Sequence, residues 1–267
     1  MSSTAASLSR YYATMADITG EQARLERLQK ATLGVPFEQQ DVAQLQDIQS
    51  ELKKRAEAAH SLAEVAAAFT ALEHSSAPAD VSTAANGLGT ELSSIQQLPD
   101  ASYAPTVLQN AGKILTQLAQ ERDERKIAKQ IDPTVAALAE MFSQEKPAYE
   151  SMNHTYIVLA QSIANDLVKH DQVDPGSLMS PALKPFGLAS RMPAEQVPQG
   201  LKDYALEEIK SRGDAEIAAH AKASDSMESA LQELQKHVHQ LAADGHAPPD
   251  SQLFKLSDVE SWIKLMQ

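Results

Sequence analysis

Apolar side chains recur along this chain at alternating steps of three and four residues, the spacing that places them on one face of an α-helix. The clearest series lies within a proline-free stretch, residues 37–77. Its positions, called the heptad seam below, are Leu45, Ile48, Leu52, Ala59, Leu62, Ala66 and Phe69. Arg55 is the one residue out of place in the series. The pattern predicts a long helix that packs through this seam.

Thirteen prolines divide the chain into stretches that are long enough for uninterrupted helices. The long proline-free stretches are residues 1–35, 37–77, 106–132, 148–174 and 199–247. Gly34 and Pro36 supply a helix end and a turn between the first two, which predicts an antiparallel helix pair. Asp132 before Pro133 is typical of a helix start, so we expect a new or kinked helix there and a further one after Pro147.

Residues 171–198 differ in character from the helical stretches. They hold five prolines and two glycines but keep several apolar side chains, so we expect this crossover to pack on the helices. Four of its residues are candidates for lining a site for a small apolar ligand or a lipid: Leu178, Met179, Phe186 and Met192.

The C-terminal residues predict a short last helix. Ser257 precedes Glu260 by three residues, which is the spacing of a capping box. Trp262 is the only tryptophan of the chain, and we expect it to dock this helix onto the rest of the fold.

These elements predict an all-α fold, an elongated antiparallel helical bundle with long heptad-like helices and one long proline-rich crossover. Composition agrees, because aromatic residues are 4% of the chain, glycines number 10 and alanine is abundant. We expect an N-terminal helical bundle over residues 1–170, the apolar crossover over 171–198, and a long helix with a docking helix over 199–267. The last part is expected to pack on the first as one unit.

Composition and charge exclude several classes of protein. The 36 acidic and 23 basic residues give a formal net charge of −13, which disfavours nucleic acid as a partner because phosphate contacts need clustered Lys and Arg. No cysteine is present, which excludes disulfides, thiolate metal sites and a cysteine nucleophile. No apolar run approaches 18 residues, so we expect no transmembrane segment. The first residues show no signal peptide as written, which leaves the localisation unknown and an exported origin open for a trimmed chain.

Pairs of glutamate and histidine are the best candidates for metal chemistry, and each has an ordinary explanation. Dinuclear sites in helical bundles use two Glu-x-x-His elements and two further glutamates, whereas this chain shows one, Glu57 with His60. The heptad seam passes beside this pair, so we expect it to be exposed. Three pairs at i to i+4 spacing are expected to be helix-surface contacts: Glu150 with His154, Glu216 with His220, and Glu233 with His237.

A second candidate for metal or acid sensing is the group of His237, His239 and His246. Residues two apart on a helix do not share a face, so we favour a role in complementing the helix dipole. Asn153 begins a glycosylation triplet inside a predicted helix, which we interpret as chance. The sequence contains neither a Gly-x-Ser-x-Gly elbow nor a phosphate-binding loop. We therefore predict no catalytic residue, no metal ligand and no cofactor.

We favour a non-catalytic scaffold or protein-interaction module that binds a protein partner, or a second copy of the chain, through an exposed helical face. The candidate interaction residues are Leu45, Ile48, Leu52, Ala59, Leu62 and Phe69, and the alternative for any one of them is packing inside the chain. One alternative function is a carrier of a lipid or small apolar ligand beneath residues 171–198. Another is a metal-dependent helical-bundle enzyme. The composition resembles that of helical exported and secretion-system proteins of bacteria, a likeness without a shared motif.

Overall fold

The computed structural model describes residues 2–36, 40–72, 78–99, 106–115, 124–175, 197–244 and 256–267. Within these ranges it contains seven helices that pack against one another and no strand, which confirms the predicted all-α fold. The helices are α1 (Ser2–Thr32), α2 (Gln40–Leu72), α3 (Pro78–Ser94), α4 (Thr106–Leu115), α5 (Glu124–Lys169), α7 (Gln199–Asp244) and α8 (Ser257–Met266). None of these described helices combines the length and the apolar character that crossing a membrane requires.

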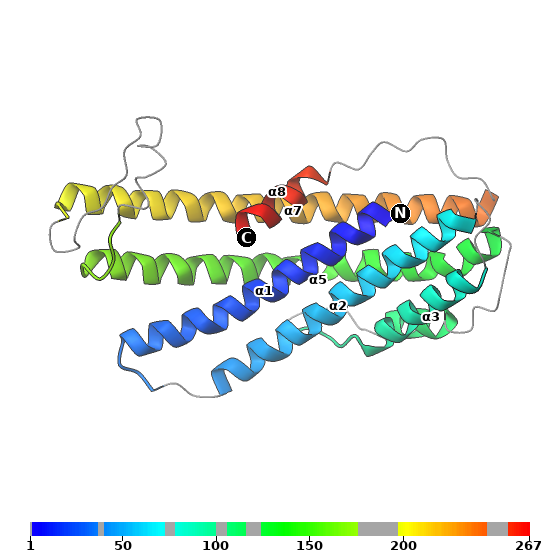
Figure 1. Cartoon of the computed structure of the whole chain (residues 1–267), viewed down its shortest axis with the longest axis horizontal. Helices are drawn as coiled ribbons and strands as arrows, with labels where there is room; N and C mark the ends of the chain where they lie inside the picture. Colours follow the sequence, from blue (N-terminus) through cyan, green and yellow to red (C-terminus); the bar gives the residue numbers. More distant parts are fainter. Residues whose placement is uncertain are drawn as a thin grey trace.

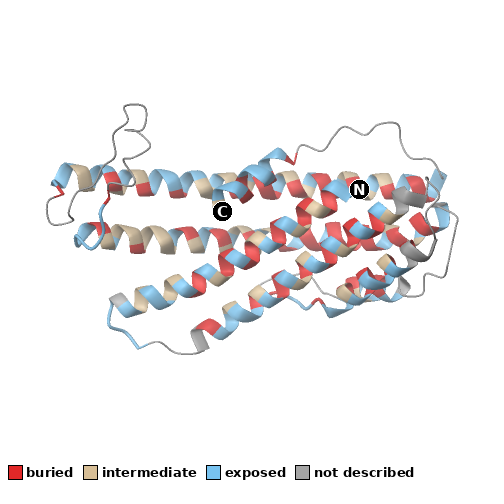
Figure 2. Ribbon diagram, in the orientation of Figure 1, coloured by how far each residue is buried: buried red, intermediate tan, exposed pale blue. Residues whose placement is uncertain are grey.

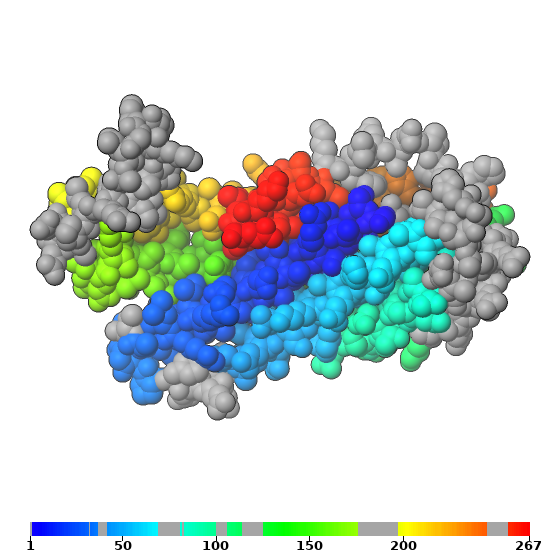
Figure 3. Space-filling view, viewed as in Figure 1, coloured from blue at the N-terminus to red at the C-terminus, as the bar shows by residue number. Residues whose placement is uncertain are grey.

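The two longest helices, α5 and α7, lie side by side and run in opposite directions along the molecule (Figure 1). Helices α1 and α2 form a second antiparallel pair that crosses them. Helix α3 packs on α2, and α4 packs on both α3 and α5. The short α8 lies over α1 and α7 (Figure 3). Toward the C-terminus of α1, the α1–α2 pair diverges from α5 and α7, so the molecule has a forked end (Figure 1).

Buried residues gather where α1 and α2 cross the long pair, and exposed residues are more common at the forked end (Figure 2). The main hydrophobic cluster takes residues from all seven described helices. A much smaller cluster, formed by Val168, Ala205 and Ile209, holds the ends of α5 and α7 together at the fork. The core therefore lies in the middle of the molecule, and the forked end is thinly packed.

Two helix ends share one backbone motif. After α1, Gly34 has a φ of 66°, and the N–H of Val35 donates to the carbonyl of Lys30 at 2.9 Å. This is a Schellman ending, and glycine is favoured there because it adopts positive φ without strain. The turn predicted at Gly34 is thus confirmed. After α5, Asp171 takes the equivalent position with a φ of 57°, and its carboxylate lies 2.6 Å from Nζ of Lys202.

Helix α5 is longer than the sequence pattern predicts. Pro133 and Pro147 lie inside a single helix of 46 residues, so the separate helix expected after Pro147 is wrong, and so is the new helix that was one of two possibilities at Pro133. Each proline removes one helical hydrogen bond, but both rings are exposed, on a side where water can serve the freed carbonyls. Residues on the opposite side, such as Val135 and Phe142, are fully buried. This packing outweighs the cost of the two prolines.

Helix α8 docks as predicted, but its start lacks the predicted capping box. Trp262 is fully buried, which confirms the predicted docking of the tail. The N-cap of α8 is Leu256, and no side chain caps the helix, so the predicted capping box of Ser257 and Glu260 is wrong. Glu260 instead forms an ion pair with Arg10 of α1, at 3.2 Å.

Replacing the exposed Pro147 by alanine should stabilise the protein. Pro147→Ala restores a backbone N–H opposite the carbonyl of Ser143, and proline is about 3 kcal/mol less favourable than alanine inside a helix. The loss of proline's rigidity in the unfolded chain offsets part of this, so we expect a gain of about 1–3 kcal/mol in the free energy of unfolding in urea. Pro198, which lies just before α7, is the matched control, and Pro198→Ala should bring no gain. A destabilised Pro147→Ala variant would contradict this account of α5.

Candidate functional site

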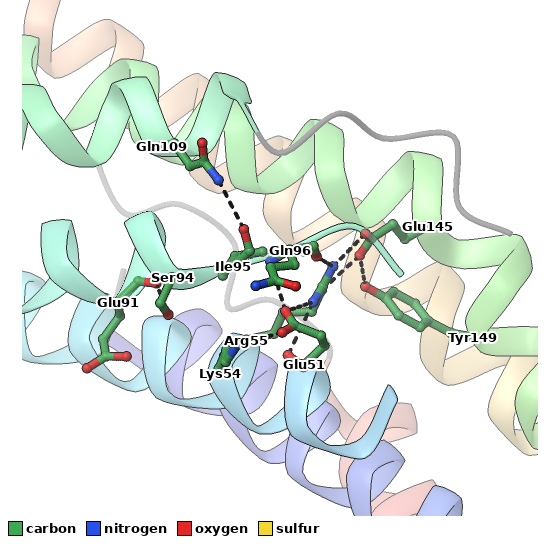
Figure 4. Close-up of polar contacts among 10 residues, drawn as sticks. All are labelled: Glu51, Lys54, Arg55, Glu91, Ser94, Ile95, Gln96, Gln109, Glu145 and Tyr149. Atoms are coloured by element: carbon green, nitrogen blue, oxygen red, sulfur yellow. Dashed lines mark hydrogen bonds and ion pairs between the residues drawn. The ribbon is translucent and has the colours of Figure 1, made fainter. Parts of the chain in front are cut away.

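Arg55, the residue that interrupts the heptad seam, points into the protein and meets α5 (Figure 4). Its Nε lies 3.0 Å from Oε2 of Glu145 and its Nη2 lies 2.7 Å from Oε1, so the two side chains form a bidentate ion pair. Both side chains are completely buried. Paired charges of this kind are the form in which arginine and glutamate enter a protein interior.

The remaining polar atoms of this pair are also satisfied. Arg55 donates to the backbone carbonyls of Glu51, at 3.2 Å, and of Gln96, at 2.9 Å. The Glu51 carboxylate accepts the N–H of Gln96 at 2.8 Å and lies 3.5 Å from the guanidinium. The hydroxyl of Tyr149 donates to Glu145 (Figure 4). We call this set the Arg55 network, and it joins α2, α5 and the segment after α3.

Two members of the Arg55 network, Arg55 and Tyr149, keep their protons. Burial by itself lowers the pKa of Arg55, but Tyr149 and Glu145 raise that pKa above its usual value, so the guanidinium stays charged. Burial raises the pKa of Tyr149 well above its usual value, so the phenol keeps the proton that it donates. Because Arg55, Glu145 and Tyr149 are all fully buried, the network is suited to fixing helices in place.

Removing one member of the buried pair should be far more damaging than removing both. Arg55→Met leaves the Glu145 carboxylate buried without its counter-charge, which costs about 3–5 kcal/mol. The double variant Arg55→Met/Glu145→Leu should recover most of this loss, because neither charge then has to be buried. Urea unfolding of the single and double variants measures the coupling. Lys53→Met, an exposed neighbour on α2, should change the free energy of unfolding by less than about 0.5 kcal/mol. Additive effects of the two substitutions would contradict the pairing.

A second buried polar group lies between α1 and α7. The Tyr11 hydroxyl lies 3.0 Å from Nε2 of His220 and 2.9 Å from Oγ of Ser224. The Trp262 ring of α8 packs over this pair, with its centroid 4.7 Å from that of His220 and 5.1 Å from that of Tyr11. All four side chains are buried.

The expectation that His220 lies on the helix surface with Glu216 is therefore wrong. The sequence did contain a signal for its burial. Met227, Leu231 and Leu234 form a regular apolar series on α7, and a step of seven residues back from Met227 reaches His220. Because histidine is polar, the apolar series by itself begins only at Met227. The burial of His220 is possible because its imidazole is neutral and Tyr11 supplies a hydrogen-bond partner.

The burial of His220 should make stability depend on pH. Burial lowers its pKa from the usual 6.5 to about 4. Between these values the unfolded chain binds a proton at this residue and the folded chain does not, so stability falls as the pH falls through this window. The loss should reach about 3 kcal/mol at pH 4. His220→Gln should remove this part of the pH dependence of the free energy of unfolding, whereas His154→Gln, on an exposed residue, should retain it. An unchanged slope in His220→Gln would show that other groups set the acid response.

The other predicted glutamate and histidine positions that the structure describes lie at or near the protein surface. Glu57 and His60 are exposed as expected, and His60 lies 3.6 Å from Glu64. His239 lies 2.9 Å from Asp132 of α5. Among the residues that the structure describes, no three His, Asp or Glu side chains come together as a metal site.

Two further predicted positions are His246 and Asn153. His246 lies outside the described residues. Asn153 is buried, so the asparagine of the glycosylation triplet is not accessible to modification in the folded chain, which agrees with its interpretation as chance.

The predicted interaction and ligand residues fall into three groups. Ile48, Leu52, Ala59 and Leu62 are buried among the chain's own helices, whereas Leu45 is partly exposed. The side chain of Phe69 lies outside the described part of the chain. So do the four candidate ligand residues of the crossover, Leu178, Met179, Phe186 and Met192. Leu52, Ala59 and Leu62 therefore belong to an internal packing surface in this conformation.

A groove of about 610 Å³ lies between α1, α2 and α5. Its apolar lining is Leu45, Ile48, Met152 and Leu159, and its polar lining includes Gln22, Gln29 and Gln44. A second groove of about 340 Å³, between α1 and α5, shares Gln29 and adds Leu33, Ile163 and Leu167. We call the two together the fork groove. Its residues come from three helices, so the pattern of one helix could not have revealed it.

Comparison with protein-family models, curated proteins and solved structures finds no match for this chain.

Proposed function

We propose that this chain is a non-catalytic helical scaffold, an elongated antiparallel bundle that binds a helix of a partner protein in the fork groove. The observation that carries the proposal is the groove itself, which combines an apolar floor with a glutamine-rich edge. A helix with an apolar stripe buries that stripe on such a floor and meets amide groups at its flanks. The chain's own Leu45 and Ile48 belong to this floor.

Exposed apolar side chains near the fork support the same proposal. Of the eight large apolar residues that are exposed in the described part of the chain, five belong to the ends of α1, α5 and α7 at the forked end or to the turns beyond them: Leu28, Leu33, Val35, Val173 and Tyr204. Leu33, which lines the fork groove, is 66% exposed. Single exposed apolar residues are normal on a protein surface, but their concentration at one end of a molecule is typical of an interaction surface.

The buried polar groups support a scaffold in another way. Arg55 and Glu145 form an ion pair with each other, and a ring nitrogen of His220 forms a hydrogen bond with Tyr11. These polar groups hold helices of the chain together, whereas the apolar side chains of the fork groove are suited to packing against a partner helix. The alternative function as a lipid or ligand carrier depends on the proline-rich crossover, most of which lies outside the described residues, so it stays a prediction.

Site-specific photo-crosslinking in the cells that make this protein tests the proposal. A photoreactive amino acid at Thr155, an exposed residue that lines the groove, should cross-link to one helical segment of a partner protein. Leu159→Glu should reduce this cross-link at least about tenfold, because a charge in the apolar floor opposes burial. The same photoreactive residue at Lys222, which is exposed on α7, is the matched control.

Three outcomes are distinguishable in this experiment. A cross-link that maps to an apolar helical stripe and disappears in Leu159→Glu supports the scaffold. A cross-link to a second copy of the chain would assign the groove to self-association. Equal cross-linking from Thr155 and Lys222, or no effect of Leu159→Glu in a variant with an unchanged circular dichroism spectrum, would overturn the proposal.

A further inference from the structure

Helix α8 packs on the rest of the protein through one narrow face. Val259 and Trp262 are fully buried and Ile263 is nearly so, whereas Leu265 on the other side is exposed. The helix contacts α7 and α1 (Figure 1), and Figure 3 shows it lying on their surface. A spacing of three residues and then one places these three anchors together on one face of the helix.

The cleft that receives Trp262 is built without help from α8. Its walls are Tyr11 of α1 and His220 of α7, and a hydrogen bond of 3.0 Å joins these two side chains. Tyr11 is further held by Ser224 at 2.9 Å and packs edge-on against Phe142 of α5, with ring centroids 5.3 Å apart. These contacts lie among α1, α5 and α7 and involve no residue of α8. We call this site the indole cleft.

The polar contacts of α8 are weak. The ion pair of Arg10 with Glu260 joins two side chains that are 54% and 48% exposed, and such pairs contribute little to stability. Ser226 donates to Asp258 at 3.1 Å, also at the surface. Among the described residues, no side chain caps the start of the helix, and none forms a hydrogen bond with the buried Nε1 of Trp262. A ten-residue helix is not stable alone in water, so docking depends on its apolar face, to which Leu256 and Met266 also belong.

We propose that α8 is a reversible strap, and that the indole cleft beneath it is a binding site for an amphipathic helix that presents an indole, which α8 occupies in the resting chain. A partner helix with the anchor spacing Val-x-x-Trp-Ile displaces α8 and pairs with the same walls. This site is separate from the fork groove, which α1, α2 and α5 line. A preformed cleft, a single large anchor and a weak rim are the features of a helix-in-groove interaction that exchanges its occupant.

Hydrogen exchange of the unsubstituted chain tests the strap. If α8 opens locally, its amides between Glu260 and Leu265 should exchange at least about a hundredfold faster than those of α1 between Leu8 and Met15. Exchange of α8 only together with α1, at the rate of global unfolding, would show that α8 belongs to the cooperative core and would overturn the proposal.

Binding of the chain's own C-terminal segment in trans tests the cleft. The probe is a fluorescein-labelled peptide of residues 256–267, and anisotropy measures its binding to the full chain. Trp262→Ala removes the resident anchor, so we expect this variant to bind the peptide at least about tenfold more tightly than the unsubstituted chain, whose cleft is filled most of the time. Leu265→Ala, at the exposed face of α8, is the matched control and should bind the peptide like the unsubstituted chain.

The peptide itself provides a further control. A peptide with alanine at the tryptophan position should bind neither protein. A helical Trp262→Ala variant that fails to bind the unmodified peptide would overturn the proposal. A Trp262→Ala variant that loses its helical circular dichroism signal would do so as well, because a detachable strap is not required for folding of the bundle.

Discussion

The bidentate pair of Arg55 and Glu145 is the constraint on which the arrangement of the helices depends. Two charges without access to water are tolerated only in one relative position of α2 and α5. A slip of one helical turn, about 5.4 Å, would separate them and leave both uncompensated. The many alanines of α2 alone would permit several registers, since small side chains pack against a neighbour in more than one way. The ion pair selects one register among them.

The second buried polar group acts at a different crossing. Tyr11 belongs to α1 and His220 to α7, so their hydrogen bond relates the first helix of the chain to the last long one. Phe142 and Tyr149 of α5 surround the Tyr11 ring, which places the two polar groups on either side of one aromatic cluster. In a chain with few aromatic residues, this concentration is where most of the specific packing lies.

The sequence pattern predicted the long helices well because their apolar periodicity is local information. It failed at Pro133 and Pro147 because the packing of α5 comes from helices far away in the chain. Arg55 was visible as an exception in the seam, but its partner Glu145 is 90 residues away and looks like any other acidic helix residue. The fork groove was beyond prediction for a related reason. It depends on the angle between helix pairs, which no single helix encodes.

The position of the Arg55 network has a mechanical consequence for the forked end. Both the α1–α2 pair and α5 extend past this point, and the part of α2 from Arg55 back to Gln40 is about 22 Å long at 1.5 Å per residue. The small cluster of Val168, Ala205 and Ile209 ties the ends of α5 and α7 at this side, together with the ion pair of Asp171 and Lys202. A rotation of about 10° about the crossing would displace the tip of such a lever by roughly 4 Å. The buried ion pair is thus the pivot of this lever. A small change in the helix crossing angle at the pivot produces a larger displacement of the far tip.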